Sequence, residues 1–97
     1  MTRRKYSINI TVNDQKIKTV VIDAHYEKKH STSINDELIL ELVQLLDGGD
    51  FEPESATQNF EYFVANDLVI RNKRYRLIWL IDKIEIYIGV VNAYRSK

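Results

Sequence analysis

The sequence predicts an α+β fold in which an antiparallel β-sheet packs on one main α-helix. Three observations predict it: two strand-like runs near the N-terminus, one apolar run with helical spacing in the middle, and several short strand-like runs toward the C-terminus. The sheet would consist of an N-terminal hairpin and a C-terminal meander. Because 97 residues suffice for one hydrophobic core, we expect a single domain spanning residues 1–97.

The N-terminal hairpin is predicted over residues 6–22. Apolar and polar residues alternate over residues 6–12, which is the period of a half-buried strand, and Asn13-Asp14-Gln15 then supplies turn chemistry. The second run becomes apolar on both faces over residues 20–22, as is typical of a strand covered on each side. We expect residues 6–12 to form an edge of the sheet, where pairing with a second copy would give a homodimer.

The helix is predicted over residues 34–46. Ser33 followed by Asp36 fits a capping pattern, and Gly48-Gly49 would end the helix. Leu40 is the exception to the apolar face, because it projects beside the polar stripe and is expected to be exposed. The apolar face itself comprises Leu38, Ile39, Leu42, Val43, Leu45 and Leu46.

The C-terminal part reads as a loop, which contains the only proline, followed by a meander. The strand-like runs cover residues 60–65, 68–71, 74–81 and 84–95. The two-residue breaks between them are of the kind that close hairpins. A tight turn at Asp82-Lys83 would place Gly89 opposite Arg76 and leave room for a ligand to approach this arginine. A bulge or simple relief of crowding would explain the same glycine.

The composition indicates a globular, cytoplasmic protein. The chain is 44% hydrophobic and 29% charged, and it has no cysteine. The absence of cysteine excludes disulfides, thiolate zinc sites and thiol nucleophiles, and it suits a reducing compartment. No stretch approaches the ~20 apolar residues of a membrane-spanning helix, so no membrane association is expected.

The formal net charge of zero hides a segregated distribution. Residues 1–30 carry a net charge of +4, residues 31–67 a net charge of −9, and residues 68–97 a net charge of +5. Two basic segments lying side by side would offer a surface to a polyanion such as RNA. The acidic segment over residues 36–67 would instead suit a basic protein partner. The plainer alternative is that the segments neutralise one another across the molecule.

Both histidines stand in the stretch DAHYEKKHS, with Lys28 and Lys29 between them. His25 and His30 would lie about 140° apart on a helix and on opposite sides of a strand, so we expect no metal site. Histidine gives or takes a proton near neutral pH, and lysine supplies positive charge to a phosphate. These are groups that RNA cleavage without a metal requires. The alternative is that this stretch is a solvated connection.

Residues 72–97 read NKRYRLIWLIDKIEIYIGVVNAYRSK. The segment begins with an aromatic–arginine pair, continues with an apolar run that ends in Ile-Asp, and closes with a second apolar strand that ends in arginine. This pattern resembles the C-terminal end of RelE/ParE-like toxins and of the wider group of compact ribonuclease toxins. The resemblance implies that Arg76 and Arg95 contact the phosphate or the transition state. It also implies that Tyr94 contacts the substrate or acts as an acid.

The features of the sequence combine into two functional hypotheses. The first is a small toxin-like RNA endonuclease of the mRNA interferase type that needs no metal or cofactor. The second is a non-catalytic antitoxin, immunity or regulatory module that binds a basic protein through the acidic middle segment, with Leu40 in the interface. For the first hypothesis the candidate catalytic residues are His25, His30 and Tyr94, and the candidate substrate contacts are Lys28, Lys29, Arg76, Tyr87 and Arg95.

Overall fold

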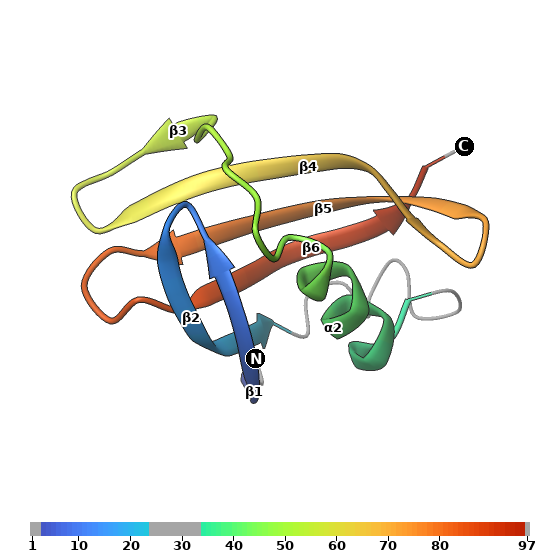
Figure 1. Cartoon of the computed structure of the whole chain (residues 1–97), viewed down its shortest axis with the longest axis horizontal. Coiled ribbons are helices and arrows are strands. Elements are labelled where there is room, and N and C mark those ends of the chain that lie inside the picture. The colour runs from blue at the N-terminus through green and yellow to red at the C-terminus, as the bar shows by residue number, and fades with distance from the viewer. Residues whose placement is uncertain (1–2, 24–33, 97) are drawn as a thin grey trace.

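The computed structural model describes residues 3–23 and 34–96. Its elements are β1 (Arg3–Val12), β2 (Gln15–Asp23), α2 (Asp36–Gln44), β3 (Ser55–Ala56), β4 (Phe60–Ile70), β5 (Lys73–Asp82) and β6 (Ile88–Arg95). In this described part of the chain the strands form a six-stranded sheet in the order β1-β2-β6-β5-β4-β3, and α2 lies against it (Figure 1). The predicted α+β class, with a helix packed on a sheet, is therefore confirmed.

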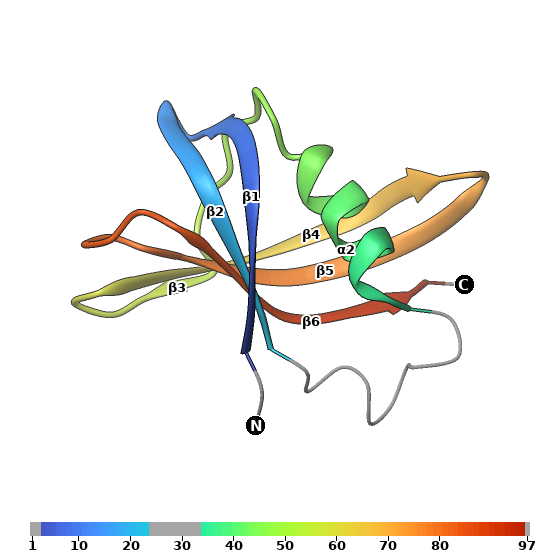
Figure 2. The same ribbon diagram turned by 90° about the horizontal axis from the view of Figure 1, so that it is seen from below.

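The sheet is mixed, whereas the sequence predicted an antiparallel one. β2 and β6 run parallel, with Val21 opposite Gly89, and the other neighbouring strands pair antiparallel. A parallel pair requires a long crossover connection, and here the chain that contains α2, β3, β4 and β5 supplies it. The N-terminal hairpin and the C-terminal meander are thus joined into one strongly twisted sheet, in which β1 and β2 cross β4 and β5 steeply (Figure 2).

β1 and β2 form the predicted N-terminal hairpin. Asn13 and Asp14 close it with φ values of 53° and 61°, a combination that favours asparagine and aspartate in two-residue turns. β1 lies at an edge of the sheet, as expected from the sequence. Pairing of this edge with a second copy stays a prediction, and the charges of Arg4 and Lys5 on β1 are of the kind that discourages edge pairing.

α2 begins at a different cap from the predicted one. Asn35 is the N-cap, and its side-chain oxygen accepts a hydrogen bond from the Leu38 N–H at 2.8 Å. Ser33 lies outside the described residues. Leu40 is partly buried and packs against the core, so it is less exposed than the sequence predicted. Leu45 is 49% exposed instead, because the helix ends at Gln44 and Leu45 serves as its C-cap. Nowhere in residues 3–23 and 34–96 is a helix long and apolar enough to cross a membrane.

The hydrophobic core lies between α2 and one face of the sheet, which we call the inner face. Trp79 of β5 is fully buried at its centre. The Trp79 ring stacks on Phe63, with centroids 4.2 Å apart, and lies perpendicular to the Phe51 ring, with centroids 5.4 Å apart. Alternate residues of the strands supply the rest of the inner face, including Val20, Ile22, Leu77, Ile81, Ile88 and Val90.

The C-terminal strands occur where the sequence predicts them, but their turns differ. β4 continues through Asn66 and Asp67 as a bulge instead of breaking there. The β4–β5 turn consists of Arg71 and Asn72, with φ values of 49° and 65°. The short strand β3 pairs with β4 inside the segment predicted as a loop.

The predicted tight turn at Asp82-Lys83 was wrong, because β6 begins only at Ile88. The Asp82 carboxylate accepts hydrogen bonds from the backbone N–H groups of Ile84 and Glu85, at 2.8 and 2.9 Å, and so stabilises a wider connection. The longer connection shifts the pairing of β5 with β6. Arg76 therefore pairs with Tyr94 and not with Gly89.

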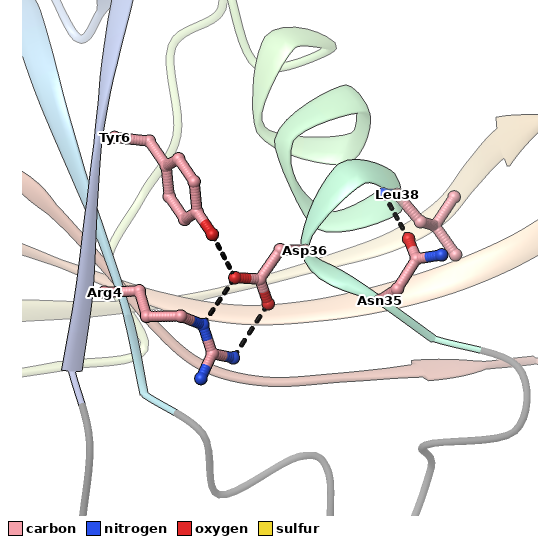
Figure 3. Close-up of polar contacts among 5 residues, drawn as sticks. All are labelled: Arg4, Tyr6, Asn35, Asp36 and Leu38. Carbon is pink, nitrogen blue, oxygen red and sulfur yellow. Dashed lines mark hydrogen bonds and ion pairs between the residues drawn. The ribbon is translucent and has the colours of Figure 1, made fainter.

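Asp36, the first residue of α2, ties the helix to β1 (Figure 3). Its carboxylate accepts hydrogen bonds from Arg4 Nε at 2.5 Å, from Arg4 Nη2 at 2.8 Å, and from the Tyr6 hydroxyl. The hydrogen bond to Asp36, together with burial, raises the pKa of Tyr6 above its ordinary value of 10.0. Asp36 also places a negative charge in the first turn, where the helix dipole favours it.

We expect Asp36→Asn to lower the free energy of unfolding by about 1–2 kcal/mol, because it removes charged hydrogen bonds between partly buried groups. Urea denaturation at pH 7 measures the change. The control is Glu41→Gln, which breaks the more exposed pair between Glu41 and Arg71 and should cost less. Equal losses in the two variants would show that Asp36 does not fix α2 to β1.

Candidate functional site

The face of the sheet opposite α2, which we call the outer face, carries a continuous row of paired residues. Lys5 pairs with Val21, Val21 with Gly89, Gly89 with Leu80, and Leu80 with Tyr62, from β1 across to β4. Directly paired residues point to the same side of a sheet, so these residues form one surface. Within the described residues no helix covers it (Figure 2).

A hollow of about 340 Å³ lies over the middle of this row. The aromatic side chains of Phe60, Tyr62 and Tyr87 line it together with Leu80 and Gly89. A Cβ atom on Gly89 would come within 2.9 Å of the Leu80 side chain. A larger residue at position 89 would require the Leu80 side chain to shift, which supports relief of crowding among the explanations offered for Gly89.

The charge around the hollow is mixed. A second hollow of about 280 Å³ shares Arg3 and Tyr87 with the first and adds Lys5 and Glu85. Burial and the nearby charge of Asp82 raise the pKa of Tyr87 above its ordinary value. Tyr87 is a neutral phenol near pH 7, as a tyrosine with its ordinary pKa also is.

Arg76 and Tyr94 form a second feature of the outer face. They are partners across β5 and β6, and the guanidinium carbon of Arg76 lies 5.7 Å from the centroid of the Tyr94 ring. Arg76 is half-buried, and its Nε atom is buried with no hydrogen-bond partner among the described residues. Arg76 and Leu80 are four residues apart on β5, hence on the same face and about 13 Å from one another.

The structure brings some of the predicted site residues together and separates others. Arg76 and Tyr94 share one part of the outer face, and Tyr87 lines the hollow on the same face. Arg95 pairs with Tyr75, whose buried side chain belongs to the core, so Arg95 lies on the inner side of the sheet. The other candidates, His25, Lys28, Lys29 and His30, lie outside the described residues.

Sequence reasoning missed the residues of the outer face that come from β1 and β4. Arg3, Lys5 and Phe60 were not singled out, and Tyr62 was considered only as one of several strand aromatics expected mostly in the core, although the alternation of Phe60 and Tyr62 in a strand-like run was a usable signal. Their convergence depends on the order of the strands, which no local pattern reveals. Within the described residues no group of three or more histidine and carboxylate side chains could hold a metal ion.

The acidic middle segment is partly neutralised within the molecule. Asp36 pairs with Arg4, and Glu41 accepts two hydrogen bonds from Arg71 at 3.0 Å. The hydrogen bonds and charge of Arg71 hold the pKa of Glu41 below its ordinary value. The exposed acidic side chains between α2 and β3 are Asp47, Asp50, Glu52 and Glu54.

Comparison of the chain with known protein families, with curated proteins and with solved structures found no match. The resemblance to RelE/ParE-like toxins, which rests on residues 72–97, therefore stays a prediction.

Proposed function

We propose that this protein binds single-stranded RNA on the outer face of its sheet and cleaves it without a metal ion, in the manner of a compact toxin-type ribonuclease. The observation that supports the proposal best is the contact between Arg76 and Tyr94 on the face that α2 leaves uncovered. Both residues are also among the site residues that the resemblance of residues 72–97 implies. An arginine held against an aromatic ring presents its remaining N–H groups in a fixed direction, as recognition of a phosphate requires.

In the proposed reaction the 2′-oxygen of the RNA forms a bond to the adjacent phosphorus, and the bond from phosphorus to the 5′-oxygen breaks. His25 and His30 take the proton from the 2′-hydroxyl and return one to the leaving 5′-oxygen. Arg76 stabilises the negative charge that develops on the phosphate oxygens, and Tyr94 donates a hydrogen bond to the same group. The products are a 2′,3′-cyclic phosphate and a 5′-hydroxyl.

The test is incubation of a 5′-labelled single-stranded RNA with the protein in the presence of EDTA. We expect cleavage of the RNA to cyclic phosphate ends and no cleavage of a DNA of the same sequence, because DNA lacks the 2′-hydroxyl. The double variant His25→Ala/His30→Ala should lose cleavage while its circular dichroism spectrum stays unchanged. Intact RNA after incubation with the native protein would contradict the proposal, and full activity in the double variant would remove the histidines from the mechanism.

A second candidate function is a non-catalytic module that binds a basic protein, such as an antitoxin, immunity or regulatory protein. The exposed side chains of Asp50, Glu52 and Glu54 favour it, because they gather negative charge on one connection. Leu40 offers little to such an interface, since it is partly buried and packs against the core. Tight, salt-sensitive binding of poly-L-lysine that Glu52→Gln/Glu54→Gln abolishes, together with inactivity toward RNA, would favour this candidate.

A further inference from the structure

We propose that the hollow on the outer face is a binding site for one nucleobase of a single-stranded RNA, held by stacking on tyrosine rings. The assignment of RNA as the source of the base rests on the proposed function above. The site itself rests on independent observations, namely the side chains that line the hollow and their position relative to Arg76.

The first observation is the chemistry of the lining. Phe60 and Tyr62 lie with ring centroids 6.3 Å apart and planes tilted by 50°, and Tyr87 contributes a third ring. Leu80 and Val21 supply apolar surface between the aromatic side chains and β1. A flat ligand with apolar faces and polar edges matches such a lining, and an unpaired base is such a ligand because it stacks on aromatic side chains.

The second observation is the size and charge of the hollow. Its volume of about 340 Å³ falls at the small end of ligand-binding pockets. Arg3 lines the hollow and Lys5 the adjoining one, and both complement a phosphate attached to the base, whereas Asp23, which pairs with Arg3 and also lines the hollow, offers a carboxylate to amino groups of the base. Glu85 lies near Tyr87 in the adjoining hollow, where its carboxylate suits amino groups on the edge of a base. Mixed charge of this kind suits a base with its phosphate better than it suits a bare polyanion.

The position of the hollow on β5 links it to Arg76. Leu80 and Arg76 share the outer face, four residues apart along one strand, which corresponds to about 13 Å. A base in the hollow and a phosphate at Arg76 therefore belong to different, nearby nucleotides of one strand. In this arrangement the hollow selects where the strand is cut and does not take part in the chemical step.

The test is an amide NMR titration with AMP and, separately, with ribose 5-phosphate. We expect AMP to shift the backbone signals of Tyr62, Leu80 and Gly89, and ribose 5-phosphate to leave these signals unchanged. Equal shifts with the two ligands would show a phosphate site and overturn the proposal, as would the absence of any shift with AMP.

The deoxytrinucleotide d(ApApA), which cannot be cleaved at a 2′-hydroxyl, should bind more tightly than AMP if the hollow receives a base from a strand. Equal affinity of the two would overturn the assignment to a strand.

Matched variants separate stacking from structure. Tyr62→Leu/Tyr87→Leu removes both rings and should weaken AMP binding at least about 10-fold, whereas Tyr62→Phe/Tyr87→Phe keeps the rings and should stay within a few-fold of the native protein. Native AMP affinity in the leucine variant would overturn the proposal. AMP binding by a protein that does not cleave RNA would support the base site and overturn the proposed ribonuclease function. RNA cleavage without AMP binding would support the ribonuclease function and overturn the base site.

Discussion

Replacing Arg76 with alanine is expected to lower the rate of RNA cleavage by about 100- to 1,000-fold, which is the usual cost of removing one preorganised group that stabilises developing charge. Arg76 is half-buried and lies against the Tyr94 ring, so its guanidinium is already oriented before RNA binds. A mobile surface arginine would have to lose side-chain entropy first, and its removal would cost less. Single-turnover cleavage of a fluorescent RNA measures the chemical step directly.

Two companion variants show whether the loss of cleavage rate comes from the planar set of N–H donors of the arginine. Arg76→Lys keeps the charge but not the planar set of donors, and an intermediate rate is expected. Arg71→Ala removes an equal charge from an exposed pair with Glu41 and should change the rate no more than a few-fold. Cleavage by Arg76→Ala at the native rate would contradict the assignment. A similar loss in Arg71→Ala would point to overall charge instead.

The elements of this fold follow from local patterns, and the pairing of its last two strands does not. Strict alternation marked the first hairpin, and helical spacing marked α2. Local patterns did not predict the β5–β6 connection. There Asp82 accepts hydrogen bonds from the backbone N–H groups of Ile84 and Glu85, and Ile86 adopts a φ of 55°. A β-branched residue rarely adopts a positive φ, so no sequence signal marks a wide connection here.

The candidate site was predictable only in part, for the same reason. Arg76 and Tyr94 were found through the resemblance of residues 72–97 to ribonuclease toxins, but their contact follows from the shifted register of β5 and β6. The hollow depends on non-local pairing: Arg3 comes from β1 and Tyr62 from β4, and only the parallel β2–β6 pair places them on one surface. A strand that is apolar on both faces, such as β2, indicates a central position in the sheet. The pattern does not identify which strand lies beside it or whether that strand runs parallel.

Replacing Trp79 with alanine is expected to lower the free energy of unfolding by about 3–5 kcal/mol. Trp79 is fully buried and contacts both Phe63 and Phe51, so its removal leaves a cavity that these rings cannot fill without moving. A loss of this size is a large fraction of the total stability of a small domain, which is about 5–15 kcal/mol. Urea denaturation followed by circular dichroism measures it, because the variant has lost the only tryptophan of the chain.

Trp79→Phe distinguishes loss of packing from loss of a polar contact. The indole N–H of Trp79 is buried without a hydrogen-bond partner among the described residues, so phenylalanine removes an unsatisfied donor while keeping a ring against Phe63. We therefore expect it to lose much less stability than the alanine variant. Equal losses would show that an unseen partner of the indole, such as a buried water, stabilises the core. Because Trp79 fixes β5 from the inner face, the alanine variant should also lose the orientation of Leu80 and Arg76 on the outer face. We therefore expect the alanine variant to lose RNA cleavage at urea concentrations at which Trp79→Phe is still active.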